Sequence, residues 1–163
     1  MKFDQKNQKN LYPPITPFDH GLLIVDEIHK IYCDQCGNPR GIPVILLHGG
    51  PGSGTNPTQR LYFTPNHYRL ILFDQPRCGN SLPYAETREN STWLLVNDIE
   101  KLRQHLEIDK WFLFGGSWGV ALALAYGGMY PKNCLGFVLR GVFLGRHREL
   151  NWFLEGIQTI FPE

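Results

Sequence analysis

The amino-acid sequence predicts an α/β fold in which a mostly parallel sheet is flanked by helices. Almost purely apolar runs recur along the chain, and segments with helical periodicity separate the later runs. This alternation favours parallel strands joined by right-handed crossovers. The chain has 163 residues, of which 42% are hydrophobic and 19% are charged. That length and composition suffice for one domain with a substantial core.

The N-terminal part of the chain predicts surface structure followed by strands. Residues 1–20 are polar and proline-rich, so we expect them to run over the surface. Gly21–Ile31 carries β-branched residues and predicts one or two strands. The segment CGNPRG, Cys36–Gly41, contains Asn-Pro and flanking glycines, which predict a turn.

Two buried strands and an amphipathic helix are predicted next. The run IPVILLHGG (Ile42–Gly50) begins almost purely apolar, as does Tyr68–Asp74. Such runs are typical of strands buried on both faces of a parallel sheet. Ser91–Ile108 has apolar residues every three or four positions after a Ser-Thr start, and it predicts an amphipathic helix.

The C-terminal part of the chain continues the alternation. Lys110–Gly116 predicts a strand, and the Ala/Leu-rich segment Val120–Tyr130, which ends before Pro131, predicts a helix. Cys134–Phe143 predicts a further strand. Arg148–Phe161 then starts another helix.

Composition and charge argue against several classes of function. The net charge is +1 without a basic tract, so nothing indicates a nucleic-acid partner. No stretch approaches the roughly 18 apolar residues of a membrane span, and the polar start does not resemble a signal peptide. The four cysteines are sparse, which fits a reducing compartment. We therefore expect a cytoplasmic protein without membrane partners.

The segment Gly115–Gly119, GGSWG, matches G-x-S-x-G between a buried strand and a helix. This context is the one that a nucleophile elbow requires, with Ser117 on a strained turn and its hydroxyl pushed out of the sheet. Side chains two residues before and after would collide, which explains glycine at positions 115 and 119. The alternative is an ordinary strand-to-helix turn with a solvated serine.

A serine nucleophile also needs two oxyanion donors. One would be the backbone N–H of Trp118, which directly follows the nucleophile. The second is expected from HGGPG, His48–Gly52, at the carboxyl end of an earlier strand. There Gly50 would let the backbone approach a substrate carbonyl. The alternative is that these glycines only form a tight turn.

Several blocks together resemble prolyl aminopeptidase, also called proline iminopeptidase, a serine peptidase with the α/β-hydrolase fold. The resemblance runs from about Leu11 to Glu163. The blocks that carry it are HGGPG, FDQ…CGNS, TWLLVNDIEKLRQHL, FGGSWG, LALAY and VLRGVFL…RELNWF…IFPE. It implies release of N-terminal proline from peptides, with no metal and no cofactor.

The resemblance also implies roles for particular residues. It makes Ser117 the nucleophile, makes the amides of Gly50 and Trp118 the oxyanion hole, and places Phe143 and Phe153 against the substrate proline. From the sequence alone these two phenylalanines would be core residues. It divides the chain into a surface segment (1–20), the N-terminal part of a hydrolase domain (21–145) and the start of a cap (146–163).

The chain departs from the family in one loop. The family usually reads D-Q-R-G-C-G-R-S where this sequence has DQPRCGNS, Asp74–Ser81. Pro76-Arg77 replaces an Arg-Gly pair, and Asn80 replaces an arginine. Proline lacks an N–H and arginine lacks the freedom of glycine, so we expect altered geometry beside the site.

The remaining triad members are not found in the expected order, which is Ser, then Asp or Glu, then His. After Ser117 the only histidine is His147, and no acidic residue lies between them. His147 is expected on the surface, and His48 belongs to the HGG loop and is a poor base. The resemblance places the catalytic Asp and His in a C-terminal half beyond Glu163.

Three expectations follow from that gap. The fold would be truncated before the rest of the cap and the C-terminal strands, so this chain would be inactive alone. The strand ending at Phe143 would lie at a sheet edge, and a chain that truly stops at Glu163 would be marginally stable or prone to aggregation. Another α/β-hydrolase, such as an esterase, or a non-catalytic remnant remain alternatives.

Two further motifs give weaker signals. Cys33 and Cys36 form a C-x-x-C between a strand-like run and a turn, a setting that suits neither a redox pair nor a zinc site. The glycine-rich GGPGSG lacks the Lys-Ser/Thr of a P-loop and does not fit G-x-G-x-x-G.

Overall fold

The computed structural model describes residues 11–86, 88 and 91–161. Within these residues, six strands form one sheet in the order β1-β2-β4-β3-β5-β6. The strands are β1 (Asp19–Ile24), β2 (Lys30–Gly37), β3 (Ile42–Leu47), β4 (Tyr68–Phe73), β5 (Trp111–Gly116) and β6 (Cys134–Arg140).

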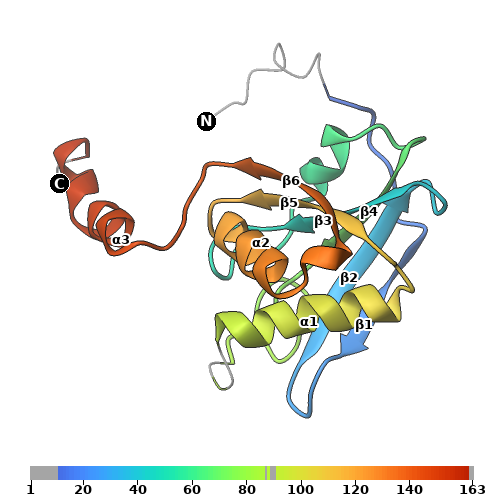
Figure 1. Ribbon diagram of the computed structural model, residues 1–163, viewed down its shortest axis with the longest axis horizontal. Coiled ribbons are helices and arrows are strands. Elements are labelled where there is room, and N and C mark those ends of the chain that lie inside the picture. Colours follow the sequence, from blue (N-terminus) through green and yellow to red (C-terminus); the bar gives the residue numbers. More distant parts are fainter. Residues whose placement is uncertain (1–10, 87, 89–90, 162–163) are drawn as a thin grey trace.

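Helices α1 and α2 lie side by side on one face of the sheet, and α3 stands apart from it at the end of an extended connection (Figure 1). Short 3-10 helices complete the described structure. The helices are η2 (Pro57–Tyr62), α1 (Thr92–His105), α2 (Trp118–Met129), η3 (Pro131–Asn133), α3 (His147–Leu154) and η4 (Gly156–Thr159).

The pairing confirms a mostly parallel sheet. β4, β3, β5 and β6 are mutually parallel neighbours, whereas β1 pairs antiparallel with β2 and β2 pairs antiparallel with β4. Helix α1 connects β4 to β5, and α2 connects β5 to β6. The carboxyl ends of these parallel strands therefore meet at one edge of the sheet, where ligands bind in open α/β folds.

The N-terminal strands differ from the sequence-based expectation in their limits. Gly21–Ile31 spans parts of two strands, separated by a turn after Ile24. The turn predicted from Cys36 begins later, because Cys36 and Gly37 still pair with β4. Residues 1–10 of the expected surface segment lie outside the described residues, and Ile15 packs against the core.

This shift of β2 also corrects the setting of the C-x-x-C motif. Both cysteines lie within the strand, and residues three apart on a strand face opposite sides. Cys33 joins the core beneath the helices, and Cys36 joins the core on the other face. Burial raises the pKa of each thiol to about 11. The described residues contain no group of three or more His, Cys, Asp or Glu side chains that could hold a metal ion.

The helices follow the predicted pattern with shifted ends. Ser91 caps α1, with its Oγ accepting from the Leu94 N–H at 3.3 Å. Helix α2 begins at Trp118 rather than Val120. The helix expected over 148–161 is interrupted after Leu154, and Gly156, a weak helix former, starts η4 there.

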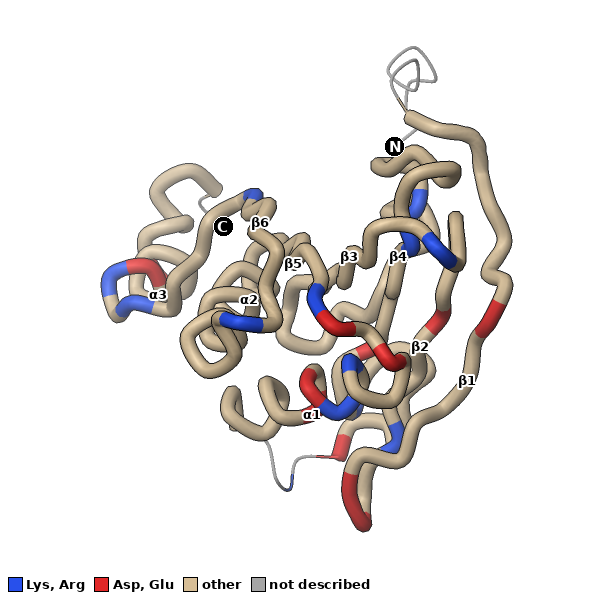
Figure 2. The backbone as a smooth tube through the Cα atoms, turned by 45° about the vertical axis from the view of Figure 1, so that its right-hand side comes forward, with Lys and Arg blue, Asp and Glu red and all other residues tan. Residues whose placement is uncertain are grey.

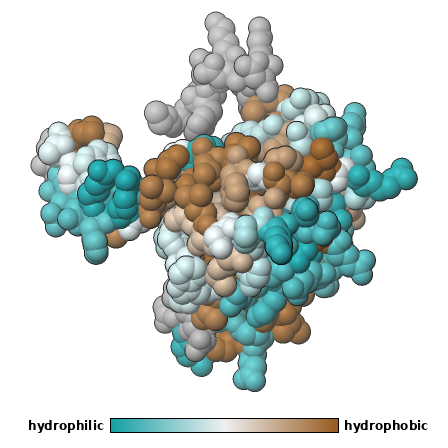
Figure 3. Space-filling view, in the orientation of Figure 1, coloured by the Kyte–Doolittle hydropathy of each residue, from teal (hydrophilic) through white to brown (hydrophobic). Residues whose placement is uncertain are grey.

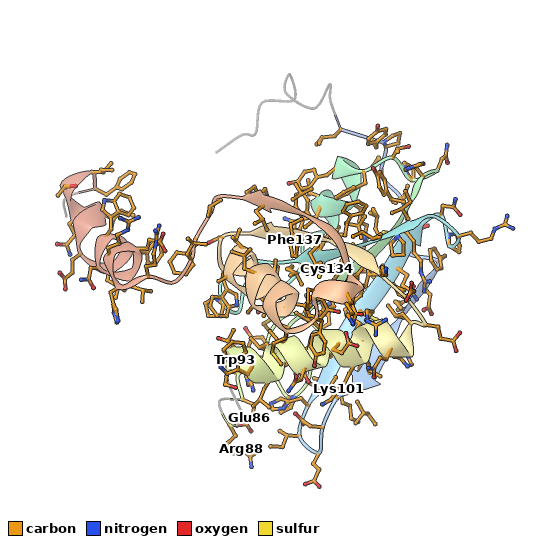
Figure 4. The ribbon with its side chains drawn as sticks, viewed as in Figure 1. Glu86, Arg88, Trp93, Lys101, Cys134 and Phe137 are labelled. Atoms are coloured by element: carbon orange, nitrogen blue, oxygen red, sulfur yellow. The ribbon has the colours of Figure 1, made fainter. Side chains whose placement is uncertain are left out.

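Strand β6 is shorter than predicted and forms an edge of the described sheet. It ends at Arg140, where Gly141 adopts a φ of 56° and turns the chain. Its apolar side chains remain exposed on both faces: Leu135 by 46%, Phe137 by 41% and Val138 by 51%. Figure 3 shows an apolar band over this strand, and Figure 4 labels Phe137 on it. The expected edge position of this strand is thus observed.

The β6 strand also shows a conflict between local sequence and position. Its residues have the apolar composition of a strand buried on both faces, but that cover is found on the central strands β3 and β4, where Val44–Leu47 and Leu70–Phe73 are buried. Phe137 finds partial cover against Gly127 of α2, where an added Cβ would lie 2.6 Å from the phenylalanine ring. Strand edges are normally paired or protected by charge, and this edge carries apolar side chains instead.

Charge is spread over the molecule rather than gathered in one tract (Figure 2). Blue and red segments alternate along the chain, in line with the small net charge of +1. In the part of the chain that the structure describes, no helix combines the length and apolar character that a membrane span requires.

A buried polar cluster fastens α1 to α2. Glu100 of α1 accepts hydrogen bonds from Tyr126 Oη at 2.7 Å and from Arg103 Nη2 at 2.6 Å. It also accepts from Asn133 Nδ2 at 3.1 Å, which ties η3 to the same point. Burial alone would raise the pKa of Glu100, but the hydrogen bonds from Arg103 and Tyr126 outweigh burial and lower this pKa to about 2.

We predict that Tyr126→Phe destabilises the fold. The change removes a hydrogen bond to a charged carboxylate at a fully buried site, which costs about 1.5–3 kcal/mol. Tyr130→Phe is the matched control, because its hydroxyl donates to the neutral Asn97 Oδ1 at 3.2 Å and should cost about 1 kcal/mol or less. Urea unfolding followed by circular dichroism compares the two, and equal losses would contradict the prediction.

Candidate active site

Ser117 lies between β5 and α2 in a strained backbone conformation. Its φ is 54° and its ψ is −120°, a region that non-glycine residues rarely adopt. The turn is held on both sides, because the Ser117 N–H donates to the Arg140 carbonyl at 3.2 Å and its own carbonyl accepts from the Val120 N–H at 2.9 Å. The residue is exposed at the carboxyl edge of the sheet.

The glycines two residues before and two residues after Ser117 leave no room for a side chain. A Cβ added at Gly115 would lie 2.5 Å from the Gly119 carbonyl oxygen. A Cβ added at Gly119 would lie 2.1 Å from the Leu47 carbonyl oxygen. Both neighbours are backbone atoms, which cannot move aside as a flexible side chain would. The steric argument for glycine at these positions is therefore confirmed.

The HGG loop after β3 lies directly beside the serine. A Cβ added at Gly49 would be 3.4 Å from the Ser117 Cβ and 3.9 Å from its Oγ. Gly50 has a φ of 119°, and a Cβ there would lie 2.4 Å from the Gly52 nitrogen, so this turn requires glycine. The loop thus lies near enough to Ser117 to take part in one site.

His48 is buried and engaged within the loops. Its Nδ1 donates to the Gly49 carbonyl at 2.8 Å, and its Nε2 accepts from the Gln75 N–H at 3.1 Å. This pair of bonds fixes one neutral tautomer. Burial lowers the pKa of His48, opposed by its hydrogen bond with Gly49 and by the negative charge of Asp74. A side chain held this way is a structural element of the loop rather than a free base.

Asp74 organises the loop that departs from the family pattern. Its Oδ1 accepts from the Thr55 N–H at 2.7 Å, and its Oδ2 accepts from the Asn80 N–H at 2.8 Å. Arg77, where the family usually has glycine, adopts a φ of 79°. The turn therefore places a non-glycine residue in the left-handed region, and arginine bears the strain.

A pocket of about 500 Å³ contains Ser117 together with both predicted phenylalanines. Phe143 follows β6, and Phe153 lies on α3. Phe153 is 64% exposed, so its interpretation as a core residue is wrong, and Phe143 is half-buried. The remaining lining includes Trp152 and the charged side chains of Arg146, Arg148 and Glu149. An apolar wall beside a nucleophilic hydroxyl suits a small apolar substrate group.

The other histidines that the structure describes do not line the pocket that holds Ser117. His29 bonds Asp26 at 2.8 Å, and His67 packs edge-on against Tyr68. His20 and His105 line a separate cavity beside β1. His147 begins α3 and is exposed, as expected.

The arrangement holds a serine hydroxyl, two loops able to offer backbone donors and an apolar pocket. Sequence reasoning missed Gln75, whose side chain bonds both His48 and Trp118. The signal available in the sequence was an amide side chain directly after the predicted strand Tyr68–Asp74.

Comparisons with known proteins agree with this geometry. A family model described as alpha/beta hydrolase fold matches residues 42–160. The chain is 57% identical over 156 residues to a probable proline iminopeptidase of Leptolyngbya boryana, covering 95% of this chain and 49% of the relative. It is 52% identical over 158 residues to a proline iminopeptidase of Arabidopsis thaliana, covering 96% of this chain and 42% of that relative.

Solved structures show the same fold. The crystal structure of a proline iminopeptidase-related protein from Thermus thermophilus matches with a TM-score of 0.67 at 26% identity, covering 77% of this chain and 44% of that chain. An epoxide hydrolase of Vigna radiata matches with a TM-score of 0.70 at 20% identity, over 86% of this chain and 45% of that chain. The chain spans about half the length of the curated relatives it matches.

We predict that Gly119→Ala destabilises the fold by several kcal/mol, because the new Cβ would meet the Leu47 carbonyl oxygen at 2.1 Å and overpacking typically costs about 1–3 kcal/mol or more. Gly128→Ala is the control on the same helix. It meets nothing within 4 Å and should stabilise by about 0.5–1 kcal/mol. Chemical denaturation measures both, and a neutral Gly119→Ala would refute the close approach.

We predict that His48 makes the protein less stable as the pH falls. Folded His48 binds a proton less readily than the unfolded chain, whose pKa is near 6.5. Its contribution is complete above that pH and declines below it, by at most about 1.4 kcal/mol per pH unit.

The test measures the free energy of unfolding above and below pH 6.5 for the wild type and for His48→Gln. The glutamine side chain can still accept a hydrogen bond from Gln75, but it does not titrate. The difference between wild type and variant isolates His48 from Asp98, whose pKa burial raises to about 6. Asp98 acts in the opposite sense, because protonation of a raised carboxyl favours the folded state. Identical pH dependence in the two proteins would show that His48 does not contribute.

Proposed function

The chain belongs to the α/β-hydrolase fold family, and from this premise we propose that it is part of a serine aminopeptidase that releases N-terminal proline from peptides. One observation carries the proposal: Ser117, on a strained elbow, shares a pocket with Phe143 and Phe153. The names of two curated relatives, each more than half identical to this chain over the matched region, support the same reaction.

In this proposal the Ser117 hydroxyl attacks the carbonyl carbon of the N-terminal proline. The strained turn presents the hydroxyl outward, and the N-terminus of α2 beneath it favours the negative charge that develops on attack. The peptide nitrogen of the next residue leaves once it has gained a proton. Water then releases proline from the acyl-enzyme in the same manner.

The amides of Gly50 and Trp118 are the proposed oxyanion donors. Trp118 directly follows the nucleophile, and Gly50 lies in the loop whose Gly49 approaches Ser117. Backbone donors that are fixed before the reaction stabilise a developing oxyanion without reorganisation, and one such donor can contribute about 2.7–4 kcal/mol. The left-handed φ of Gly50 supports a tight turn that brings its backbone close.

Phe143 and Phe153 are the proposed contacts for the proline ring. They come from different segments, one after β6 and one on α3, and line the same pocket. A pyrrolidine ring is compact and apolar, and aromatic faces bury it at little conformational cost. We accordingly assign residues 21–145 to the hydrolase domain and 146–163 to the start of a cap over the pocket.

Ser117 needs a base that the described residues do not supply. His48 is neutral and engaged, and His147 is exposed outside the pocket lining. The curated relatives are about twice as long as the matched region. We propose that the acid and base come from that further length, as the resemblance to the family implies.

A chimera tests the reaction directly. It joins this chain to the part of the Leptolyngbya boryana relative that follows the matched region. We expect hydrolysis of a proline anilide, with Ser117→Ala lowering kcat about 10⁴- to 10⁶-fold. Phe143→Ala should raise KM for the proline substrate more than for an alanine anilide.

Two outcomes of this assay would overturn the proposal. A folded chimera that hydrolyses short esters with no preference for proline anilides would favour an esterase. Equal rates with and without Ser117→Ala would favour a non-catalytic protein. Circular dichroism of each variant checks that a loss of activity is not caused by a loss of folded structure.

We predict that the chain of 163 residues does not by itself hydrolyse proline anilide, because an unactivated serine hydroxyl is a weak nucleophile near neutral pH. The measurement is turnover by the purified chain against its Ser117→Ala variant. Turnover that depends on Ser117 would show that a base within the chain activates the serine.

A further inference from the structure

We propose that Gln75 is a positioning residue that ties together the two loops carrying the proposed oxyanion donors. This inference rests on the proposed function for the role of the Gly50 and Trp118 amides. The tie itself is a set of contacts that can be tested without turnover.

The strand order shows how far Gln75 must reach to connect the two loops. Gln75 follows β4, His48 follows β3 and Trp118 follows β5. In the sheet β3 lies between β4 and β5, so a contact from Gln75 to Trp118 crosses two strand spacings, roughly 10 Å. Among the residues that the structure describes, no backbone–backbone hydrogen bond joins the three loops beyond the strand ends.

Three hydrogen bonds make the crossing. The backbone N–H of Gln75 donates to His48 Nε2 at 3.1 Å, and the side-chain Nε2 of Gln75 donates to the His48 carbonyl at 3.0 Å. The Gln75 Oε1 accepts from the Trp118 indole Nε1–H at 3.1 Å. One residue therefore binds the HGG loop with two bonds and the first residue of α2 with a third.

Burial makes these bonds hard to replace. Gln75 and His48 are each only 2% exposed, so water does not substitute freely for a lost partner. A buried polar group that loses its partner costs about 1–3 kcal/mol. The loop arrangement with all three bonds intact is thus favoured over arrangements in which either loop shifts.

The chemistry of this position calls for an amide. The His48 carbonyl needs a donor, and the Trp118 indole needs an acceptor. Glutamine supplies both from one planar group. Glutamate would keep the acceptor and lose the donor, and leucine of similar size would lose both. Substitutions of Gln75 can therefore remove one or both side-chain bonds, while the bond from its backbone N–H to His48 Nε2 remains available.

The two anchored residues adjoin the proposed donors. Trp118 is itself one of them, and Gly50 lies two residues beyond His48. The His48 ring in turn donates to the Gly49 carbonyl at 2.8 Å, which extends the restraint along the loop. An oxyanion hole acts through donors held at fixed positions, so a tie between the loops would act on the rate of reaction rather than on substrate affinity.

Nuclear magnetic resonance on the full 163-residue chain tests the tie. Backbone order parameters report the rigidity of Gly50 and Trp118, and the indole Nε1–H resonance of Trp118 reports its hydrogen bond. We expect order parameters near those of rigid backbone, about 0.85, in the wild type. In Gln75→Leu both sites should fall toward the flexible range, below about 0.6.

Gln75→Glu removes the side-chain bond to the His48 carbonyl and retains the acceptor for the Trp118 indole. It also replaces Gln75→Leu as the test if that variant fails to fold. The indole resonance should stay in its hydrogen-bonded position, while Gly50 loses order because a carboxylate now faces the His48 carbonyl. Trp118→Phe approaches the tie from its other end and should loosen Gly50 less than Gln75→Leu does. Gln158→Glu makes the same amide-to-acid change on an exposed residue and should alter neither site.

The outcomes separate a positioning role from general stabilisation. Loss of order confined to Gly50 and Trp118, with Leu46 and Leu113 unchanged, supports the proposal. Values at Gly50 and Trp118 within error of the Gln158→Glu control overturn it, as does an equal loss at all four sites.

In the chimera, Gln75→Leu should lower kcat about 10- to 100-fold with KM changed less than about threefold, the pattern expected when only transition-state stabilisation is lost. Turnover that depends on Ser117 but not on Gln75 would overturn the positioning role and leave the proposed function intact. No turnover dependent on Ser117, with selective loss of order in Gln75→Leu, would overturn the proposed function while supporting the tie.

Discussion

The close approach of Gly119 to the end of β3 is the constraint on which the site depends. The helix α2 starts so near the strand that only a residue without Cβ fits against the Leu47 carbonyl. Ser117 is the single residue between β5 and α2, and it takes a backbone conformation with positive φ. The same proximity brings Gly49 of the HGG loop beside the serine. One steric requirement thus fixes the exposure of the hydroxyl and the neighbour it faces.

Buried polar groups then hold the loops that the sheet itself does not. Asp74 and Gln75 are consecutive residues at the end of β4, and their side chains serve different loops. The Asp74 carboxylate binds Thr55 and Asn80, whereas the Gln75 amide binds His48 and Trp118. Each is almost fully buried, so each bond is made in a medium where its loss is costly. Hydrogen bonds in this way link the loops at the carboxyl edge of the sheet outside the region of regular pairing.

The sequence by itself determined the alternation of strands and helices, the mostly parallel sheet and the steric need for glycine around Ser117. These features depend on local periodicity and on contacts between residues close in the chain, which a single sequence displays. Through a family resemblance, the sequence also indicated Phe143 and Phe153 as substrate contacts, although their apolar character alone suggested core residues. Their common pocket with Ser117 depends on how the chain turns at Gly141 after β6.

Only the tertiary structure decided which residues meet across the sheet. The strand order places β3 between β4 and β5, and no periodicity in the sequence specifies that order. The contact of Gln75 with Trp118 follows from it. Such relations arise from long-range packing, in which residues distant along the chain become neighbours, and a local pattern carries no record of them.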